Sequence, residues 1–527
     1  MLFRVQRQLH HLVSSNTSLQ YAIELGADGL VDGSPQCPLT TPERLRLLLA
    51  QRTAWRRLHP HTTLTFPVET NWFAFDIAGG VLASYRLTAE NQLALRTLPS
   101  RAFGGSTLGA KHMPLDIKDF AIDPAQDLFA LVEGFRGAPT VEVGEFAAAG
   151  ADGVLRIHLR TLRSLGLETH SAARTHTLEV HMLQHLQYVK LQIAEDVLAV
   201  FTHIVPAVLS IWNWRTGQEL VHFREDASPD RTSDFAFLSP RAYLLTDRSG
   251  LVHLYPLDGA PAPPNSPSNT RSLPPDDARR VTLALPALDR GHELDYVACH
   301  TGPFVSNAGE RAPFAPASDA RVHVLVIQAD MHAGEAALAS EILESVALAF
   351  VISTAALLRF LGNHPTAATI KDPDAVVLER RIPWADWGPT CSRVFDLGFE
   401  EHVSERAVHG ARVVMPTRSL KDPEQYHLQV LDFNASRRGL DIVSDVPPAK
   451  GELIAEGALI RSPTGLAEHA QVIFVEPVES HLPYYAATFG KDVFDVDDEL
   501  LMDDARLVRY PAEEDERTAD RMDVFVF

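Results

Sequence analysis

The stretch Asp196–Phe223 reads DVLAVFTHIVPAVLSIWNWRTGQELVHF, and Ser233–Asp258 reads SDFAFLSPRAYLLTDRSGLVHLYPLD. Short apolar runs alternate here with turn residues, at the spacing of about 8–12 residues that is typical of antiparallel strands. Thr216-Gly217 and Ser249-Gly250 suit the turns, because glycine adopts a positive φ without steric cost. The two segments therefore predict consecutive antiparallel strands joined by tight turns.

The same pattern occurs a second time in the chain. Residues 115–133 read LDIKDFAIDPAQDLFALVE, in which Asp119-Phe120-Ala121 precede an aspartate–proline turn, as Asp234-Phe235-Ala236 precede Ser239-Pro240. Internal repeats of strands that cannot bury their faces alone are typical of propeller blades. We predict an all-β, propeller-like domain over residues 61–527, with six to eight blades from the usual range for such domains.

Residues 1–60 differ from the rest and predict helices. Apolar residues recur there at helical spacing, and Leu19–Leu25 offers a second apolar face. Thr41 is the expected N-cap of a further helix that ends before Pro60, with Pro42 in its first turn. We expect one helical segment over 1–25 and linker helices over 26–60. The first helix presents Val5, Leu9, Leu12 and Val13.

Composition limits the classes of function. Of the 527 residues, 46% are hydrophobic, which is enough for a large core, and the net charge is −21. A nucleic-acid-binding protein normally carries a basic face, so nucleic acid is not an expected partner.

The cysteine spacing and the lack of secretory and membrane-spanning patterns predict an intracellular protein. Three cysteines far apart, Cys37, Cys299 and Cys391, give neither a disulfide framework nor a zinc motif and fit a reducing compartment. The N-terminus lacks a secretory pattern, and the longest uncharged apolar run, 345–358, is shorter than the ~18 residues that a membrane-spanning helix needs. We expect a soluble protein of the cytoplasm or nucleus, without a membrane partner.

No motif predicts catalysis, a cofactor or a metal. The histidines near His181 lack an HExxH pattern, and the acidic run from Asp495 lacks the glycine and final glutamate of a calcium loop. Trp384 and Trp387, beside Gly388-Pro389, leave two interpretations open: a ligand platform, or anchors of a loop against the core, which is the more common use of tryptophan. We therefore expect a binding protein rather than an enzyme.

Two regions resemble basidiomycete F-box proteins that carry a C-terminal propeller-like domain. The first contains VQRQLHHLVSSNTSLQYAIELGADGLVDG from Val5 and TPERLRLLLAQRTAWRRL from Thr41. The second contains, in order, KDFAIDPAQDLFALVE, LSIWNWRTGQ, SDFAFLSPRAYLLTD, IPWADWGP, VHGARVV and LQVLDFN. An F-box normally opens with a Leu-Pro-x-Glu segment and two earlier helices. The resemblance therefore implies partial F-box-like helices over 1–25, from a motif truncated at the N-terminus.

The resemblance implies an adaptor of a cullin-RING (SCF) ubiquitin ligase. Its N-terminal helices would bind the Skp subunit, and its propeller would bind an unknown target protein. Two alternatives stay open: a propeller scaffold without ligase coupling, and a propeller enzyme such as a glycoside hydrolase, which needs convergent carboxylates or histidines in the central channel. The residues implied in partner binding are Leu9, Leu12, Val13, Leu19 and Tyr21.

Overall fold

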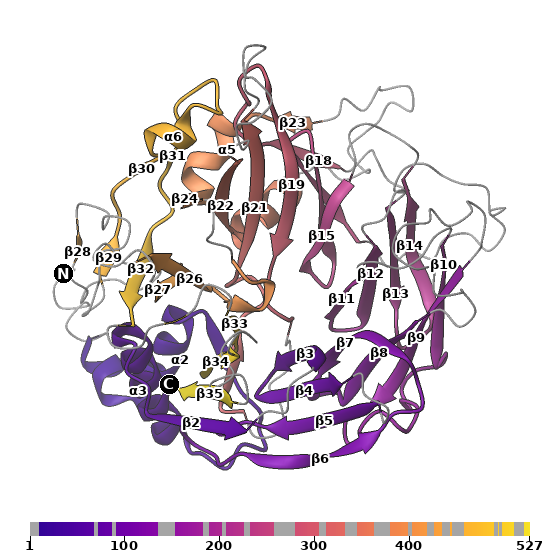
Figure 1. Cartoon of the computed structure of the whole chain (residues 1–527). Coiled ribbons are helices and arrows are strands. Elements are labelled where there is room, and N and C mark those ends of the chain that lie inside the picture. The colour runs from indigo at the N-terminus through magenta and orange to yellow at the C-terminus, as the bar shows by residue number, and fades with distance from the viewer. Residues whose placement is uncertain are drawn as a thin grey trace, which may run out of the picture.

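Seven β-sheets stand in a ring in the computed structural model of the chain (Figure 1). Each sheet is one blade, so the predicted all-β propeller is confirmed, and its blade number lies within the expected range. The structure describes residues 10–67, 72–86, 91–134, 153–182, 189–202, 207–225, 232–257, 280–304, 312–331, 345–362, 380–398, 403–418, 426–434, 443–444, 458–489, 494, 498–510 and 521–527.

The first three blades are four-stranded and take their strands in chain order. They are blade 1, β3 (Trp72–Ala78), β4 (Val81–Arg86), β5 (Gln92–Thr97) and β6 (Ser106–His112); blade 2, β7 (Ile117–Asp123), β8 (Leu128–Glu133), β9 (Gly153–Thr161) and β10 (Thr177–Met182); blade 3, β11 (Val189–Ala194), β12 (Val197–Thr202), β13 (Val208–Asn213) and β14 (Gln218–Arg224).

Blades 4 to 6 are less regular, because blades 4 and 6 carry added strands. They are blade 4, β15 (Thr232–Ser239), β16 (Ala242–Asp247), β17 (Leu251–Pro256), β18 (Val281–Ala284) and β23 (Arg380–Ile382); blade 5, β19 (His292–His300), β21 (Val322–Met331), β22 (Ser345–Ser353) and β24 (Ser392–Gly398); blade 6, β25 (Val408–His409), β26 (Arg412–Arg418), β27 (Tyr426–Asp432), β32 (Tyr484–Thr488), β29 (Ala458–Ile460) and β28 (Val443–Ser444).

Blade 7 closes the ring by joining strands from both parts of the chain. The strand β2 (Thr62–Pro67) pairs antiparallel with β35 (Arg521–Val526), beside β34 (Arg506–Tyr510) and β33 (Glu499–Met502). Figure 1 shows β2 at the rim and β33 toward the centre of the ring. The main-chain ladder of blade 7 therefore ties the segment after the N-terminal helices to the last strands.

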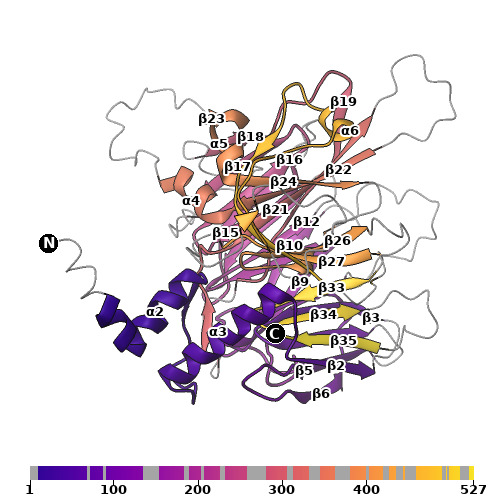
Figure 2. The ribbon, with the colours of Figure 1, turned by 90° about the vertical axis from the view of Figure 1, so that its left-hand side faces the viewer.

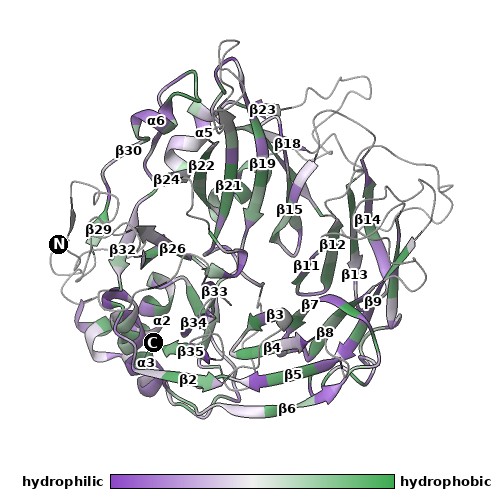
Figure 3. Ribbon diagram, in the orientation of Figure 1, coloured by the Kyte–Doolittle hydropathy of each residue, from purple (hydrophilic) through white to green (hydrophobic). Residues whose placement is uncertain are grey.

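The repeated Asp-Phe-Ala unit lies on the innermost strand of its blade. Asp119 on β7 and Asp234 on β15 each follow a shift in strand register, and the adjacent Phe120 and Phe235 are buried between blades. The two units are thus equivalent, as the sequence predicted. The strands β8, β12 and β16 are buried along their whole length, since both of their faces pack on neighbouring blades. The apolar character of β8 and β12 is visible in Figure 3.

Short elements decorate this ring. Figure 2 shows α2 and α4 together on one side of the blades. Among the described residues, no helix has the length and apolar character needed to cross a bilayer. The elements are α2 (Thr17–Ala27), α3 (Thr41–Arg57), α4 (Thr354–Gly362), α5 (Trp384–Cys391) and α6 (Glu468–Gln471); the 3₁₀ turns η1 (Pro124–Gln126) and η4 (Glu405–Ala407); and the pairs β1 (Leu30–Asp32) with β20 (Phe314–Pro316) and β30 (Thr464–Gly465) with β31 (Glu479–Ser480).

The start of α3 corrects one sequence expectation. Its N-cap is Thr40 rather than Thr41, because the carboxylate of Glu43 accepts hydrogen bonds from the backbone N–H of Thr40 at 2.8 Å and from its hydroxyl at 2.7 Å. A glutamate three residues after the cap satisfies an N–H that would otherwise lack a partner. The helix ends at Arg57, before Pro60 as expected.

Candidate partner-binding surface

The helix α2 divides its side chains between the molecule and solvent. Tyr21 and Leu25 are buried against α3, whereas Leu19 and Ile23 are 37% and 52% exposed. Leu19 and Ile23 are four residues apart, so they lie on one face of the helix. Leu12, in the helical turn that precedes α2, is 53% exposed. This face offers apolar contact area that no other part of the described chain covers.

The five residues implied in partner binding have different environments. Leu12 and Leu19 are exposed, Val13 is half-buried, and Leu9 lies outside the described residues. Tyr21 is buried, with its hydroxyl 2.9 Å from Asp32 Oδ1. Burial, helped by Asp32, raises the pKa of this hydroxyl well above its ordinary value. Tyr21 therefore holds α2 against the rest of the molecule and is not available to a partner. Ile23 is exposed on the same helix, and the sequence did not predict it as a binding residue.

Two arginines of α3 hold α2 and the following loop in place. The guanidinium of Arg52 contacts Glu24 at 2.6 Å and Asp28 at 2.9 Å, both at the end of α2. Arg44 is buried and contacts Asp32 at 2.7 Å. The position of the exposed α2 face is thus set by α3.

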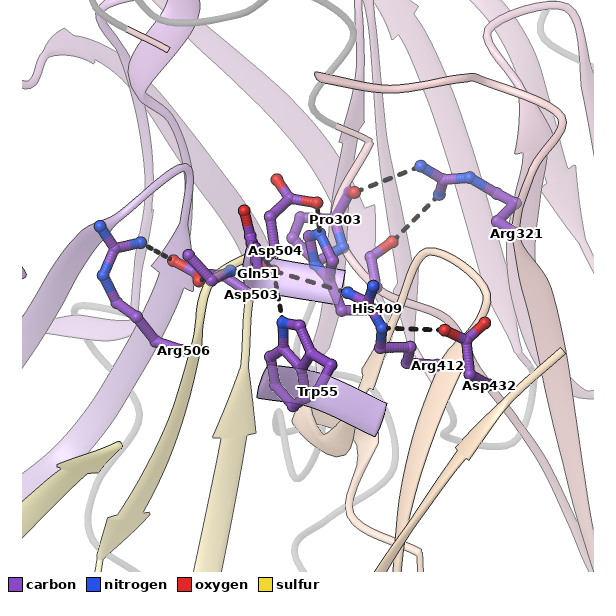
Figure 4. Close-up of polar contacts among 12 residues, drawn as sticks. Gln51, Trp55, Pro303, Arg321, His409, Arg412, Asp432, Asp503, Asp504 and Arg506 are labelled. Atoms are coloured by element: carbon purple, nitrogen blue, oxygen red, sulfur yellow. Dashed lines mark hydrogen bonds and ion pairs between the residues drawn. The ribbon is translucent and has the colours of Figure 1, made fainter. Parts of the chain in front are cut away.

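The propeller in turn holds α3 through its closing blade (Figure 4). The Trp55 ring stacks on Phe527 with ring centres 3.8 Å apart. The indole N–H of Trp55 and the amide of Gln51 donate to the backbone carbonyl of Asp504, at 3.1 and 2.6 Å. The two hydrogen bonds therefore join α3 to the turn between β33 and β34, and the ring stacking joins it to the residue that follows β35.

The side chain of Asp504 makes this turn a meeting point of three blades. Its carboxylate is 3.0 Å from His409 Nε2 of blade 6. Burial alone would raise the pKa of Asp504, but the charge and hydrogen bond of His409, with Arg412 and Arg506, hold that pKa below its ordinary value. Arg506 also donates to the Leu98 carbonyl of blade 1 at 3.1 Å. The junction under α3 is therefore charge-balanced and tightly held.

The central channel is the second concentration of polar groups. A cavity of about 170 Å³ lies against the inner strands β3, β7 and β11 and the turn η4. Burial raises the pKa of Asp76 to about 6 and that of Asp119 to about 7, although the charge of Arg406 opposes both shifts. Because burial outweighs the charge of Arg406, both carboxyl groups hold their protons at higher pH than ordinary aspartates do.

Hydrogen bonds to side chains connect the inner strands of successive blades. Asp76 accepts from the N–H of Ile122 on β7 at 3.2 Å, and Asp234 accepts from the N–H of Cys299 on β19 at 2.7 Å. The buried ammonium of Lys190 on β11 donates to Asp234 at 2.8 Å. Asp76 and Asp234 thus accept hydrogen bonds from backbone N–H groups and from a lysine ammonium of neighbouring blades. Their role in the channel is structural.

The two tryptophans beside the Gly-Pro turn behave differently. Trp387 is fully buried and donates to the Ala284 carbonyl at 2.9 Å, which confirms the anchoring interpretation for this residue. Trp384 is only partly buried and packs edge-on against Trp387. Within the residues described, no group of three or more His, Cys, Asp or Glu side chains is arranged to hold a metal ion.

Comparisons with known proteins add likeness of architecture only. No protein-family model matches the sequence, and no curated protein matches it. Among solved structures, the WD40 domain of SCAP from fission yeast is 7% identical with a TM-score of 0.36, covering 88% of this chain and 98% of its own. The β-propeller domain of Myceliophteria thermophila Cps50 (Swd1) is 10% identical with a TM-score of 0.35, covering 89% and 99%. The fold is defined by the seven sheets of the chain itself.

Proposed function

We propose that this chain is a protein-interaction adaptor that resembles F-box substrate receptors of cullin-RING ligases. The observation that carries the proposal is that one helix attaches to the propeller while its neighbour keeps an apolar face exposed. Trp55 and Gln51 of α3 attach to the propeller, while α2 leaves Leu19 and Ile23 in solvent. In this proposal α2 binds the Skp subunit, and the propeller binds a target protein in the cytoplasm or nucleus.

The rigid attachment supports an adaptor because a ligase must hold its target at a set position. A flexible linker would spread the bound target over many positions. Here the ion pairs of Arg52 hold α2 against α3, and the stacking of Trp55 on Phe527 holds α3 against blade 7.

A scaffold without ligase coupling is the second candidate. It is favoured by the burial of Tyr21, which removes one of the five residues implied in Skp binding. A glycoside hydrolase is disfavoured, since Asp76 uses one oxygen on the N–H of Ile77 and the other on that of Ile122. A catalytic pair needs carboxylates directed at the sugar.

A pull-down of the full chain with the Skp subunit tests the proposal. We expect the wild-type chain to bind and the double variant Leu19→Asp/Ile23→Asp to lose at least tenfold in affinity, because charge enters an apolar contact. Leu49→Asp is the matched control, since Leu49 is 39% exposed on α3. A wild-type chain that does not bind, or a double variant that binds as well as wild type, contradicts the proposal.

A further inference from the structure

A groove of about 660 Å³ lies where blades 4 and 5 meet. Its walls are residues 284–288 after β18, residues 383–385 at the start of α5, and residues 474–477 after α6. These elements lie along the upper edge of the ring in Figure 1, on other blades than those that hold α3. The volume falls within the ~300–1,000 Å³ usual for binding pockets.

The groove is mainly apolar. Leu294 and Ile327 are buried among its lining residues, and Phe474 and Leu285 form buried parts of its walls. At the rim, Val475 is 61% exposed. An exposed valine next to a hollow lined with buried aliphatic and aromatic side chains is a surface that water solvates poorly.

Two hydrogen-bond donors of the lining have no partner in the described chain. The exposed guanidinium of Arg381 on β23 makes no ion pair or hydrogen bond there, although the chain as a whole carries a net charge of −21. Trp384 makes ring contacts with Phe350 and Trp387, and its indole N–H has no acceptor within the described residues. The opposite rim carries one carboxylate, Glu476.

These features define the chemistry of an occupant. Two free donors against one acceptor favour an anionic group, and a guanidinium binds a carboxylate through two parallel hydrogen bonds. The apolar hollow requires a hydrophobic side chain next to that anion. We propose that the groove docks a short peptide segment of the target protein in which a large apolar residue adjoins an acidic residue. The inference rests on the proposed adaptor function and names the propeller surface that would bind the target.

A phage-displayed library of random peptides, selected on the immobilised full chain, tests this inference. We expect enriched peptides to pair Leu, Phe or Trp with a neighbouring Asp or Glu. The variant Ala385→Trp places a large side chain at the lining and should weaken the selected peptides at least tenfold. The variant Arg381→Glu should change the selected charge from acidic to basic. Arg174→Glu, an exposed arginine between β9 and β10 of blade 2, is the matched control and should change nothing.

Two results would overturn the inference: no peptide is enriched, or the enriched peptides bind Ala385→Trp and Arg381→Glu as they bind wild type. Near-ultraviolet circular dichroism of each variant separates loss of the groove from loss of the fold. The Skp pull-down on the same variants separates the two proposals. Intact Skp binding without peptide selection removes only the groove, and peptide selection without Skp binding removes only the ligase role.

Discussion

The helices α3 and α2 are neighbours in sequence, yet they relate to the propeller in opposite ways. α3 buries Leu45, Leu48 and Trp55 and donates hydrogen bonds to a turn of blade 7. α2 packs on α3 and on Phe314 of β20 through Tyr21 and Leu25, and it keeps its other face in solvent. One helix therefore serves as an anchor, and the other is the surface that the anchor presents.

The largest effect is expected from removing the anchor's aromatic ring. Trp55→Ala loses the stacking on Phe527 and the hydrogen bond to Asp504, and large buried aromatic truncations cost about 3–5 kcal/mol. Urea denaturation of the full chain measures the loss. A cost below about 1 kcal/mol would show that α3 is not an anchor.

A smaller effect is expected from the charge beneath the anchor. Asp504→Asn keeps the backbone carbonyl that Trp55 uses but weakens the contact with His409. Because the folded-state pKa of Asp504 is lowered, the carboxylate stabilises the protein above its unfolded pKa of about 3.9 and loses that effect as the pH falls.

We therefore expect Asp504→Asn to destabilise the protein at pH 7 by about 1–2 kcal/mol, the order of magnitude usual for a lost hydrogen bond to a charged group, and by much less near pH 3. Denaturation at both pH values measures the difference. If the loss of stability is the same at both pH values, the charge of Asp504 does not contribute to the attachment of α3.

The channel provides a carboxylate outside the anchor, with the opposite dependence on pH. The pKa of Asp119 is raised to about 7, so the folded state retains a proton that the unfolded state releases above about pH 4. The difference in proton binding between the two states destabilises the folded wild-type chain as the pH rises from about 4 to 7.

Asp119→Asn should therefore raise the free energy of unfolding by about 1–2 kcal/mol at pH 8, because solvent in the channel screens part of the cost of the buried charge. Near pH 4 the variant should be as stable as wild type. Thermal unfolding at the two pH values measures this. A variant that is less stable at pH 8 would mean that Asp119 is ionised and well paired.

The smallest effect on stability is expected on the exposed helix. Leu19→Ser/Ile23→Ser changes side chains in solvent, and such changes usually stay within ~0.5 kcal/mol. Thermal unfolding of the double variant beside wild type measures it. A loss of several degrees in Tm would show that this face packs against the molecule rather than serving a partner.

The parts of this architecture that could be predicted are those with a local signal. The spacing of turns and the repeated units at Asp119 and Asp234 predicted the blades, because strand patterns depend on residues that are near one another in sequence. Asp76 carries no following Phe-Ala and was missed, although it lies in the same channel. The contact of Gln51 with Asp504 spans 453 positions and has no local pattern. The groove at Arg381 likewise requires three segments that only folding brings together.

Hydrogen exchange of the full chain, with and without the Skp subunit, distinguishes an anchored α3 from a loosely attached one. We expect the amides of α3 in the free chain to be protected as strongly as those of β34 and β35, and the added subunit to protect α2 around Leu19 and Ile23. Rapid exchange throughout α3 would show that α3 is not an anchor, and a subunit that leaves α2 unchanged would show that α2 is not its binding surface.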